Sequence, residues 1–213
     1  MKTIYLVRHG ESEINVSGAF MYDAPPPLTE LGKEQSRYLA KRAKKLTFDV
    51  IIASPFERTK QTAEMIVKET GHPIEYSELF TERTMPTSLV GKSRSDPDAK
   101  KLYDTAVRSS CEPGSEKVEG TETFEEMKER AGQALRFLEQ RSEEDILVVG
   151  HGFFTKMLIA RMLYGENMTA NDFAPFEWGW RTRNTGISVL KYDPSDPHRS
   201  WWLLVWNDHA HLG

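Results

Sequence analysis

Two residues that can bind anions or transfer protons, Arg8 and His9, directly follow a short apolar run near the start of the chain. Gly10 comes next in the sequence. A second arginine, Arg58, ends the segment SPFER after another apolar run, and a second histidine, His151, lies in the segment GHG after a third. Arginine presents a planar fork of donors that matches phosphate oxygens, and it keeps its charge at any working pH. Two arginines and two histidines brought together would form a site that binds an oxyanion such as phosphate.

The two histidines are candidates for a nucleophile. A histidine can form a covalent intermediate that divides one difficult transfer into two easier steps. Phosphoryl transfer depends mostly on positioning and charge stabilisation, so a neutral imidazole in a cationic pocket is sufficient, and no metal or other cofactor is expected. The leaving alkoxide needs a proton, and Glu82 in the segment TERT is the candidate acid. Spacing alone does not distinguish His9 from His151 as the nucleophile.

Three apolar runs rich in β-branched residues precede these groups, at residues 3–7, 49–53 and 146–149. None of them alternates with polar residues, which is typical of strands covered on both faces of a parallel sheet. In open α/β sheets, ligands bind outside the carboxyl ends of the strands. The segments that follow the three runs should therefore meet at one edge of the sheet.

Helical patterns separate these runs, so the sequence predicts the α/β class. Four helices are expected, over residues 29–46, 57–71, 123–141 and 153–165. In the first helix, Thr29 is the expected N-cap. Its expected buried face consists of Leu31, Leu39, Ala43 and Leu46.

Two further patterns lie in the second half of the chain. Thr123 and Glu126 have the spacing of a capping box at the start of a helix. Strand character is found at residues 186–192 and 201–207, and a polar segment with two prolines separates them. This pattern predicts a hairpin or a pair of edge strands.

The bulk composition limits the possible partners and location. A chain of 213 residues with 38% hydrophobic residues can form one substantial core. A formal net charge of -4 argues against broad binding to nucleic acid or to an anionic membrane. The single Cys111 excludes an internal disulfide, and the apolar run at residues 4–7 is too short for a secretory signal. We expect a cytoplasmic protein.

The segments RHGESEIN, SPFER and VGHG, with Glu82 after LFT, occur in the chain order of the histidine phosphatase superfamily, also called phosphoglycerate-mutase-like. The chain resembles this family over nearly its whole length, and the resemblance is weakest between residues 84 and 120. It implies a single domain over residues 1–213, built as a three-layer α/β/α sandwich with a mostly parallel sheet. It also implies a lid-like insertion at residues 83–120, and the low apolar content of that segment predicts no core of its own.

The resemblance also implies roles for individual residues. His9 is implied to be the phosphorylated nucleophile, and Glu82 the proton donor that later activates water. The phosphate oxygens are implied to be bound by Arg8, Asn15, Arg58 and His151. Asn15 could instead cap a turn, and Arg83 is either a surface charge or a substrate contact, so both residues have two readings.

The resemblance to phosphatases is closer than that to mutases. After the first motif, the mutase branch carries a tryptophan–asparagine pair and an F-x-G-W segment, and it has a tyrosine and glycine after E-R-H; this chain has neither pattern. We therefore expect hydrolysis of a small phosphomonoester or a phosphorylated protein side chain. A cofactor-dependent phosphoglycerate mutase and a non-catalytic phospho-ligand binding module are the alternatives. An oligomer is possible. Asp208, His209 and His211 are close enough in sequence to suggest a metal site, but solvated terminal side chains are the better reading.

Overall fold

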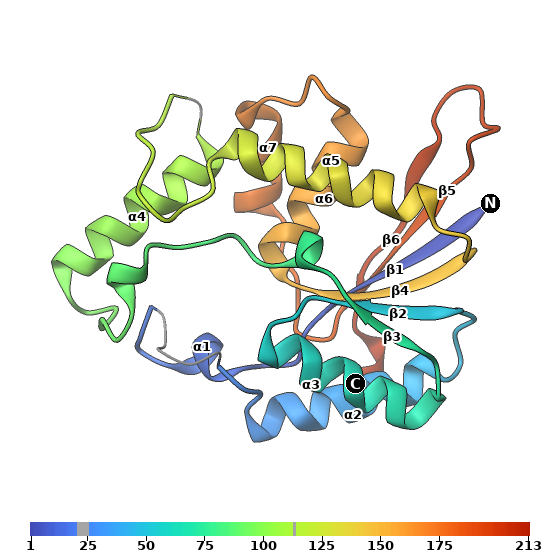
Figure 1. Cartoon of the computed structure of the whole chain (residues 1–213). Helices are drawn as coiled ribbons and strands as arrows, with labels where there is room; N and C mark the ends of the chain where they lie inside the picture. Colours follow the sequence, from blue (N-terminus) through green and yellow to red (C-terminus); the bar gives the residue numbers. More distant parts are fainter. Residues whose placement is uncertain (21–25, 113) are drawn as a thin grey trace.

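The computed structural model describes residues 1–20, 26–112 and 114–213, and a six-stranded mixed sheet forms the centre of this part of the chain (Figure 1). The strands are β1 (Lys2–Arg8), β2 (Val50–Ala53), β3 (Ile74–Tyr76), β4 (Asp145–Gly150), β5 (Ile187–Tyr192) and β6 (Trp201–Asp208). Their order across the sheet is β3-β2-β4-β1-β5-β6. The pairs β1–β4, β2–β4 and β2–β3 are parallel, whereas β5 is antiparallel to both β1 and β6. The predicted mostly parallel sheet is confirmed.

Helices cover both faces of this sheet. They are α1 (Glu13–Val16), α2 (Glu30–Ala43), α3 (Glu57–Thr70), α4 (Pro97–Cys111), α5 (Phe124–Gln140), α6 (Gly152–Tyr164) and α7 (Ala170–Gly179). Short 3-10 turns lie at η1 (Glu78–Phe80), η2 (Thr87–Leu89) and η3 (Ala210–Leu212). Helices α2 and α3 lie on one face, and α5 and α6 lie on the other (Figure 1). The architecture is the expected three-layer α/β/α sandwich.

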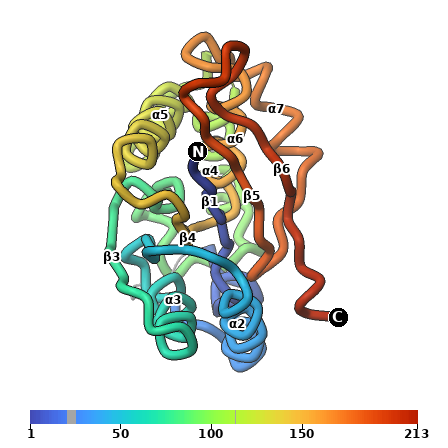
Figure 2. Tube along the Cα trace, turned by 90° about the vertical axis from the view of Figure 1, so that its right-hand side faces the viewer, coloured from blue at the N-terminus to red at the C-terminus, as the bar shows by residue number. Residues whose placement is uncertain are grey.

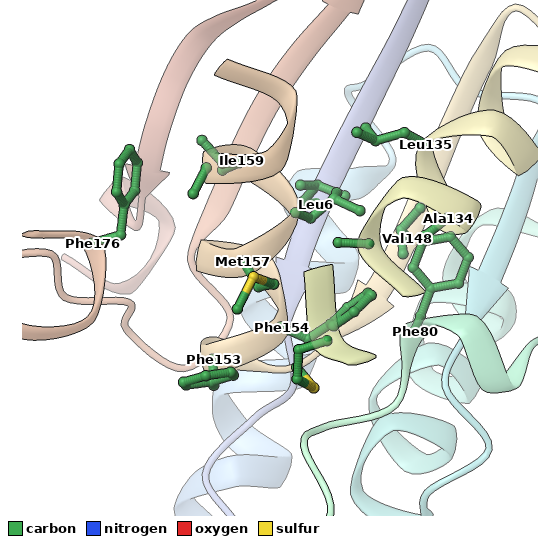
Figure 3. Close-up of a cluster of buried hydrophobic side chains, with 14 of the residues drawn as sticks. Leu6, Phe80, Ala134, Leu135, Val148, Phe153, Phe154, Met157, Ile159 and Phe176 are labelled. Atoms are coloured by element: carbon green, nitrogen blue, oxygen red, sulfur yellow. The ribbon is translucent and has the colours of Figure 1, made fainter. Parts of the chain in front are cut away.

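The four inner strands β1, β2, β4 and β5 contribute side chains to both layers, because successive residues of a strand point to opposite faces. Val7 and Ile51 pack into the cluster shared with α2 and α3. Leu6 and Val148 belong to the other cluster, where they face Phe154 of α6 (Figure 3). The central strands are buried on both faces, which explains why their sequences do not alternate with polar residues.

The first predicted helix has the expected start but not the whole expected face. The side chain of Thr29 accepts a hydrogen bond from the backbone N–H of Gly32, so its N-cap role is confirmed. Leu39 and Ala43 are buried, but Leu31 is 51% exposed, so its predicted burial is wrong. The buried stripe of α2 runs through Gly32, Ser36, Leu39 and Ala43, and Leu31 lies beside this stripe.

The capping box at the start of α5 is confirmed. The Thr123 side chain accepts from the backbone N–H of Glu126, and the Glu126 carboxylate accepts from the backbone N–H of Thr123.

The segment at residues 83–120 contributes more to the core than its composition suggests. It contains the 15-residue helix α4, which begins with the N-cap Asp96 followed by Pro97. Val107 and Cys111 of α4 are buried in the main cluster, and Leu89 lies in a smaller cluster with Phe20 and Ala99. These side chains join the common core or pack with Phe20 from outside the segment, so the segment adds to the shared core and does not form a separate one. Helix α4 buries mainly small side chains, and these add little to the apolar count.

The predicted strands near the C-terminus are confirmed as the adjacent pair β5 and β6. Figure 2 shows β6 beyond β5, followed by the C-terminus. No helix in the described residues has the length and apolar character needed to cross a membrane.

Candidate active site

The three central strands end level with one another, and this brings distant segments together. Arg8 of β1 pairs with Gly150 of β4, and Ala53 of β2 pairs with Val149 of β4. The residues that follow, including His9 and His151, therefore leave the sheet at the same edge. This edge is where ligands bind in open α/β sheets.

Arg58 connects the two histidines. It lies in the first turn of α3, directly after the segment that follows β2. Its Nε donates to Nε2 of His9 at 3.1 Å, and its Nη2 donates to Nδ1 of His151 at 3.1 Å. The two imidazole rings lie with centroids 5.2 Å apart. The structure thus brings three of the predicted site residues into direct contact.

The hydrogen bonds fix the tautomer of each imidazole. Nδ1 of His9 lies 2.6 Å from the carbonyl oxygen of Gly10, which only accepts, so Nδ1 carries the proton and Nε2 the lone pair. In His151, Nδ1 must accept from Arg58, so Nε2 donates to Oγ of Ser54 at 2.9 Å. Both lone pairs are therefore directed at the same guanidinium group.

Burial and charge keep both imidazoles neutral. Burial, and then the positive charges of Arg58 and Arg8, hold the pKa of His9 well below its usual value. For His151, burial and the charge of Arg58 lower the pKa in the same way. Burial also lowers the pKa of Arg58 to about 10, although Glu82 opposes this change, so Arg58 remains charged at neutral pH. A neutral imidazole beside a cation is suited to attack an electrophile in an anionic ligand.

Arg8 occupies a tight position beside the start of α6. Its Nη1 donates to the carbonyl oxygen of Thr182 at 2.6 Å. Its buried Nε has no hydrogen-bond partner in the described part of the chain. A Cβ on Gly152 would lie 2.7 Å from Oγ1 of Thr182 and 3.4 Å from this Nε, so any larger residue would force Thr182 to shift. A buried donor with no partner is suited to an anionic ligand.

Glu82 belongs to the same site. Its Oε2 accepts from the backbone N–H of Phe153 at 3.2 Å, and its Oε1 from that of Phe154 at 3.1 Å. These N–H groups lie in the first turn of α6, one turn from His151. The negative charge of Glu82 also raises the pKa of both Arg8 and Arg58, although burial lowers each of them more. The carboxyl group is therefore within electrostatic range of the cationic cluster.

Asn15 takes the capping role, which is one of the two readings given for it. Its Oδ1 accepts from the backbone N–H and the hydroxyl of Ser12, both at 3.0 Å, so it completes a capping box at α1. Nδ2 of Asn184 also approaches Oδ1 at 3.5 Å. These bonds use the oxygen of the amide, and its NH₂ group is the part suited to donate to an anion.

Arg83 is not a freely exposed surface charge. Its guanidinium lies 4.1 Å from the ring centroid of Phe153 and 4.0 Å from Oε1 of Glu177 in α7. Its Nη1 lies 3.9 Å from Sγ of Cys111 in α4, and burial raises the pKa of that thiol to about 12. Arg83 therefore lies where the lid-like segment meets α6 and α7.

The three polar residues near the C-terminus do not form a cluster of ligands. Asp208 pairs with Arg42 at 3.3 Å, whereas Nε2 of His211 contacts Oγ1 of Thr185 at 3.1 Å. Nδ1 of His209 contacts the backbone carbonyl of Asn207. In residues 1–20, 26–112 and 114–213, no group of three or more His, Cys, Asp or Glu side chains is placed to hold a metal ion.

Several supporting residues were not predicted from the sequence. Ser54 holds His151, and Oγ1 of Thr62 accepts from the backbone N–H of Gly10 at 3.1 Å. Nδ2 of Asn184 donates to the carbonyl oxygen of His9 at 2.9 Å. Ser54 opens SPFER and could have been suspected from that motif, whereas Thr62 is a single polar residue without a distinctive pattern.

The chain is similar to known proteins over most of its length. The family model of the histidine phosphatase superfamily (branch 1) matches residues 4–209. A probable phosphoglycerate mutase GpmB of Salmonella choleraesuis (strain SC-B67) is 29% identical over 214 residues, covering 100% of this chain and 95% of the relative.

Two solved structures share the fold at low sequence identity. Bacillus stearothermophilus YhfR has a TM-score of 0.81 and 23% identity, with 100% of both chains covered. The Entamoeba histolytica phosphoserine phosphatase in complex with 3-phosphoglyceric acid has a TM-score of 0.76 and 24% identity, also with 100% of both chains covered.

Proposed function

Because this chain belongs to the histidine phosphatase superfamily (branch 1), we propose that it is a metal-independent phosphatase that hydrolyses phosphomonoesters through a phosphohistidine. The observation that carries this proposal is the hydrogen-bonded set in which Arg58 joins two buried, neutral histidines, with Arg8 beside them. Two arginines supply the positive charge that a phosphoryl group requires, and a neutral imidazole supplies the nucleophile.

In the first step, Nε2 of His9 attacks phosphorus. The N–P bond forms as the bond from phosphorus to the ester oxygen breaks, and a protonated Glu82 gives its proton to the departing alkoxide. The N–H of Nδ1 stays hydrogen-bonded to the carbonyl oxygen of Gly10. This bond orients the imidazole ring and stabilises the positive charge that develops on the ring. Arg8 and Arg58 bind the phosphoryl oxygens, and His151 joins them when its one N–H turns from Ser54 to a phosphoryl oxygen. The NH₂ group of Asn15 adds a further donor.

In the second step, water attacks the phosphohistidine. The Glu82 carboxylate takes a proton from this water as the new P–O bond forms and the N–P bond breaks. Inorganic phosphate leaves, His9 is again neutral, and Glu82 is again protonated. Positioning by charged donors and proton transfer by one carboxyl group account for both steps.

His9 is a better nucleophile than His151 on the geometry of their hydrogen bonds. The lone pair of His9 lies on Nε2, the ring nitrogen remote from the backbone. The lone pair of His151 lies on Nδ1, which is next to Cβ and more crowded, while its Nε2–H is occupied by Ser54. We therefore assign His151 to phosphate binding.

A phosphoglycerate mutase is the second candidate, because the curated relative at 29% identity carries that name. A mutase must retain the phosphoenzyme and return the group to its substrate, which requires that water be excluded. The chain lacks the tryptophan and the Y-G pair expected of the mutase branch. We therefore favour hydrolysis.

The lid-like segment at residues 83–120 and Arg83 would select the substrate. Arg83 directly follows the proposed acid and carries a positive charge beside α4 and α7. We propose a small phosphorylated metabolite whose second polar or anionic group contacts Arg83. The related phosphoserine phosphatase bound to 3-phosphoglyceric acid is consistent with a substrate of this size.

The deciding experiment is to trap the intermediate. The parent protein, mixed with p-nitrophenyl phosphate and quenched, should carry an acid-labile, base-stable phosphate on His9, and His9→Ala should lose turnover. Turnover by the parent should be unchanged by EDTA. Full activity of His9→Ala, or phosphate on another residue, would contradict the assignment.

A coupled assay with 3-phosphoglycerate separates hydrolysis from isomerisation. Release of phosphate should exceed isomerisation. The reverse order would favour the mutase, and tight phosphate binding without turnover of any phosphomonoester would favour a binding module.

A further inference from the structure

Arg130 of α5 forms an unusually complete set of hydrogen bonds next to the proposed acid. All five guanidinium N–H groups have acceptors. Nη1 donates to the backbone carbonyls of Leu79 at 3.1 Å and Thr81 at 2.9 Å. Nε and Nη2 form a fork on the Glu122 carboxylate at 2.7 and 2.8 Å, and Nη2 also contacts Sδ of Met127.

These contacts hold the backbone on both sides of Glu82. Leu79 and Thr81 precede Glu82, and their carbonyls are fixed by Arg130. On the other side, the backbone N–H of Thr84 donates to Oε2 of Glu122 at 3.2 Å. The ion pair of Arg130 and Glu122 therefore clamps a six-residue stretch with Glu82 inside it.

Arg130 also supports the surface on which the Glu82 carboxylate rests. Its guanidinium lies 4.2 Å from the ring centroid of Phe154 in α6. The backbone N–H of Phe154 donates to Oε1 of Glu82. One side chain thus fixes both the chain segment that carries the carboxyl group and the helical turn that receives it.

We propose that Arg130, braced by Glu122, is a positioning residue that holds Glu82 for proton transfer to the leaving group. This inference rests on the proposed role of Glu82 as the acid. Proton transfer requires heavy atoms within about 3 Å of each other, so a small displacement of Glu82 would remove most of its effect. Arg130 itself does not touch the reacting atoms.

The dependence on the leaving group is the readout that a merely structural role would not change. An alkyl phosphate must release a basic alkoxide, which needs the proton from Glu82. p-Nitrophenyl phosphate releases a stable phenolate, which does not. The quantity to compare is kcat/KM, because it reports the steps up to departure of the alcohol and excludes the later attack of water.

The test variant is Arg130→Lys, which keeps the charge but cannot span two carbonyls and both oxygens of Glu122. Glu122→Gln is the second variant, because it weakens the clamp from its other side. Arg136→Lys is the matched control, since Arg136 lies on the same helix and forms an exposed ion pair with Glu129. Thermal unfolding of each variant checks that it is folded.

We expect Arg130→Lys to lower kcat/KM for n-butyl phosphate about 100-fold, as is typical for a misplaced catalytic group, and that for p-nitrophenyl phosphate less than about threefold. Glu122→Gln should show the same pattern with a smaller loss, and Arg136→Lys should match the parent. Equal losses on both substrates, or no loss on either, would overturn the proposal. If Arg130→Lys does not fold, Glu122→Gln decides by the same criteria.

Glu82→Gln distinguishes failure of this inference from failure of the proposed function. If Glu82→Gln spares the aryl substrate and loses the alkyl one, the acid is correctly assigned. If Arg130→Lys then fails to show a selective loss on the alkyl substrate, only the positioning role of Arg130 is refuted. If Glu82→Gln does not discriminate between the two substrates, the assignment of the acid fails, and the inference about Arg130 fails with it.

Discussion

The two neutral histidines at the centre of the site should make the protein unstable to mild acid. His9 and His151 are 3% and 1% exposed, and their pKa values lie well below the ordinary value because of burial and the charge of Arg58. In the unfolded chain both would titrate near a pKa of about 6.5. Below that pH the unfolded chain binds more protons than the folded protein, so stability is complete above about pH 6.5 and falls as the pH decreases.

The expected size of the effect follows from proton linkage. Lowering the pH from about 7.5 to about 5.5 stabilises the unfolded state by about 1 kcal/mol for each histidine that stays neutral in the folded protein. The two histidines together should lower the free energy of unfolding by roughly 2 to 3 kcal/mol, a large share of the ~5–15 kcal/mol typical of a globular protein. Carboxylates with lowered pKa, such as Glu143 at about 2, lose their contribution at lower pH and do not obscure this window.

Urea unfolding followed by circular dichroism between about pH 5.5 and about pH 7.5 measures this dependence. His9→Gln and His151→Gln are the matched variants, because an amide can replace one donor and one acceptor but does not titrate. Each variant should remove a similar, large share of the pH dependence, and the remainder includes His211, whose pKa is also lowered by burial. An identical slope in the parent and in the double variant would show that these imidazoles are not held neutral and would refute the reasoning.

Three further predictions concern the same site. Gly152→Ala should lower kcat/KM at least about tenfold, because the new Cβ would lie 2.7 Å from Oγ1 of Thr182; steady-state kinetics with p-nitrophenyl phosphate would show this. Ser54→Ala should cost about 1 kcal/mol of stability and lower kcat, because it removes the partner of the Nε2–H of His151; unfolding and kinetic measurements on one preparation test both effects, and unchanged values would contradict the role of Ser54. Orthovanadate at about 100 times its Kd should raise the free energy of unfolding by about 2.7 kcal/mol in the parent, and Arg58→Met should lose most of this gain at the same concentration.

The parts of the fold that follow simple spacing rules could be predicted from the sequence. The strands at residues 3–7 and 146–149 consist of uninterrupted apolar residues, and parallel strands place their carboxyl ends together. For that reason the convergence of the segments around Arg8 and His151 could be inferred before the structure. The N-terminal caps of α2 and α5 could also be predicted from the sequence, because such a cap depends on residues only three positions apart.

The parts that depend on tertiary contacts could not be predicted. Helix α4 was missed because its buried face consists mainly of small residues, although Asp96 and Pro97 mark its start. Leu31 is 51% exposed although Gly32, the next residue, is buried, so the edge of the buried face of α2 depends on its tertiary neighbours. The clamp of Arg130 and Glu122 joins two residues eight positions apart to a distant loop, and no local pattern marks such an arrangement.

The bridge that Arg58 makes between the histidines has a consequence for turnover. In the proposed reaction an arriving substrate must take over donors that already have partners within the protein, so binding is an exchange of hydrogen bonds and not a simple gain. When inorganic phosphate departs, the guanidinium returns to Nε2 of His9 and Nδ1 of His151, which offsets part of the cost of releasing a dianion. Product inhibition should accordingly be weaker than two arginines in one cavity would otherwise suggest.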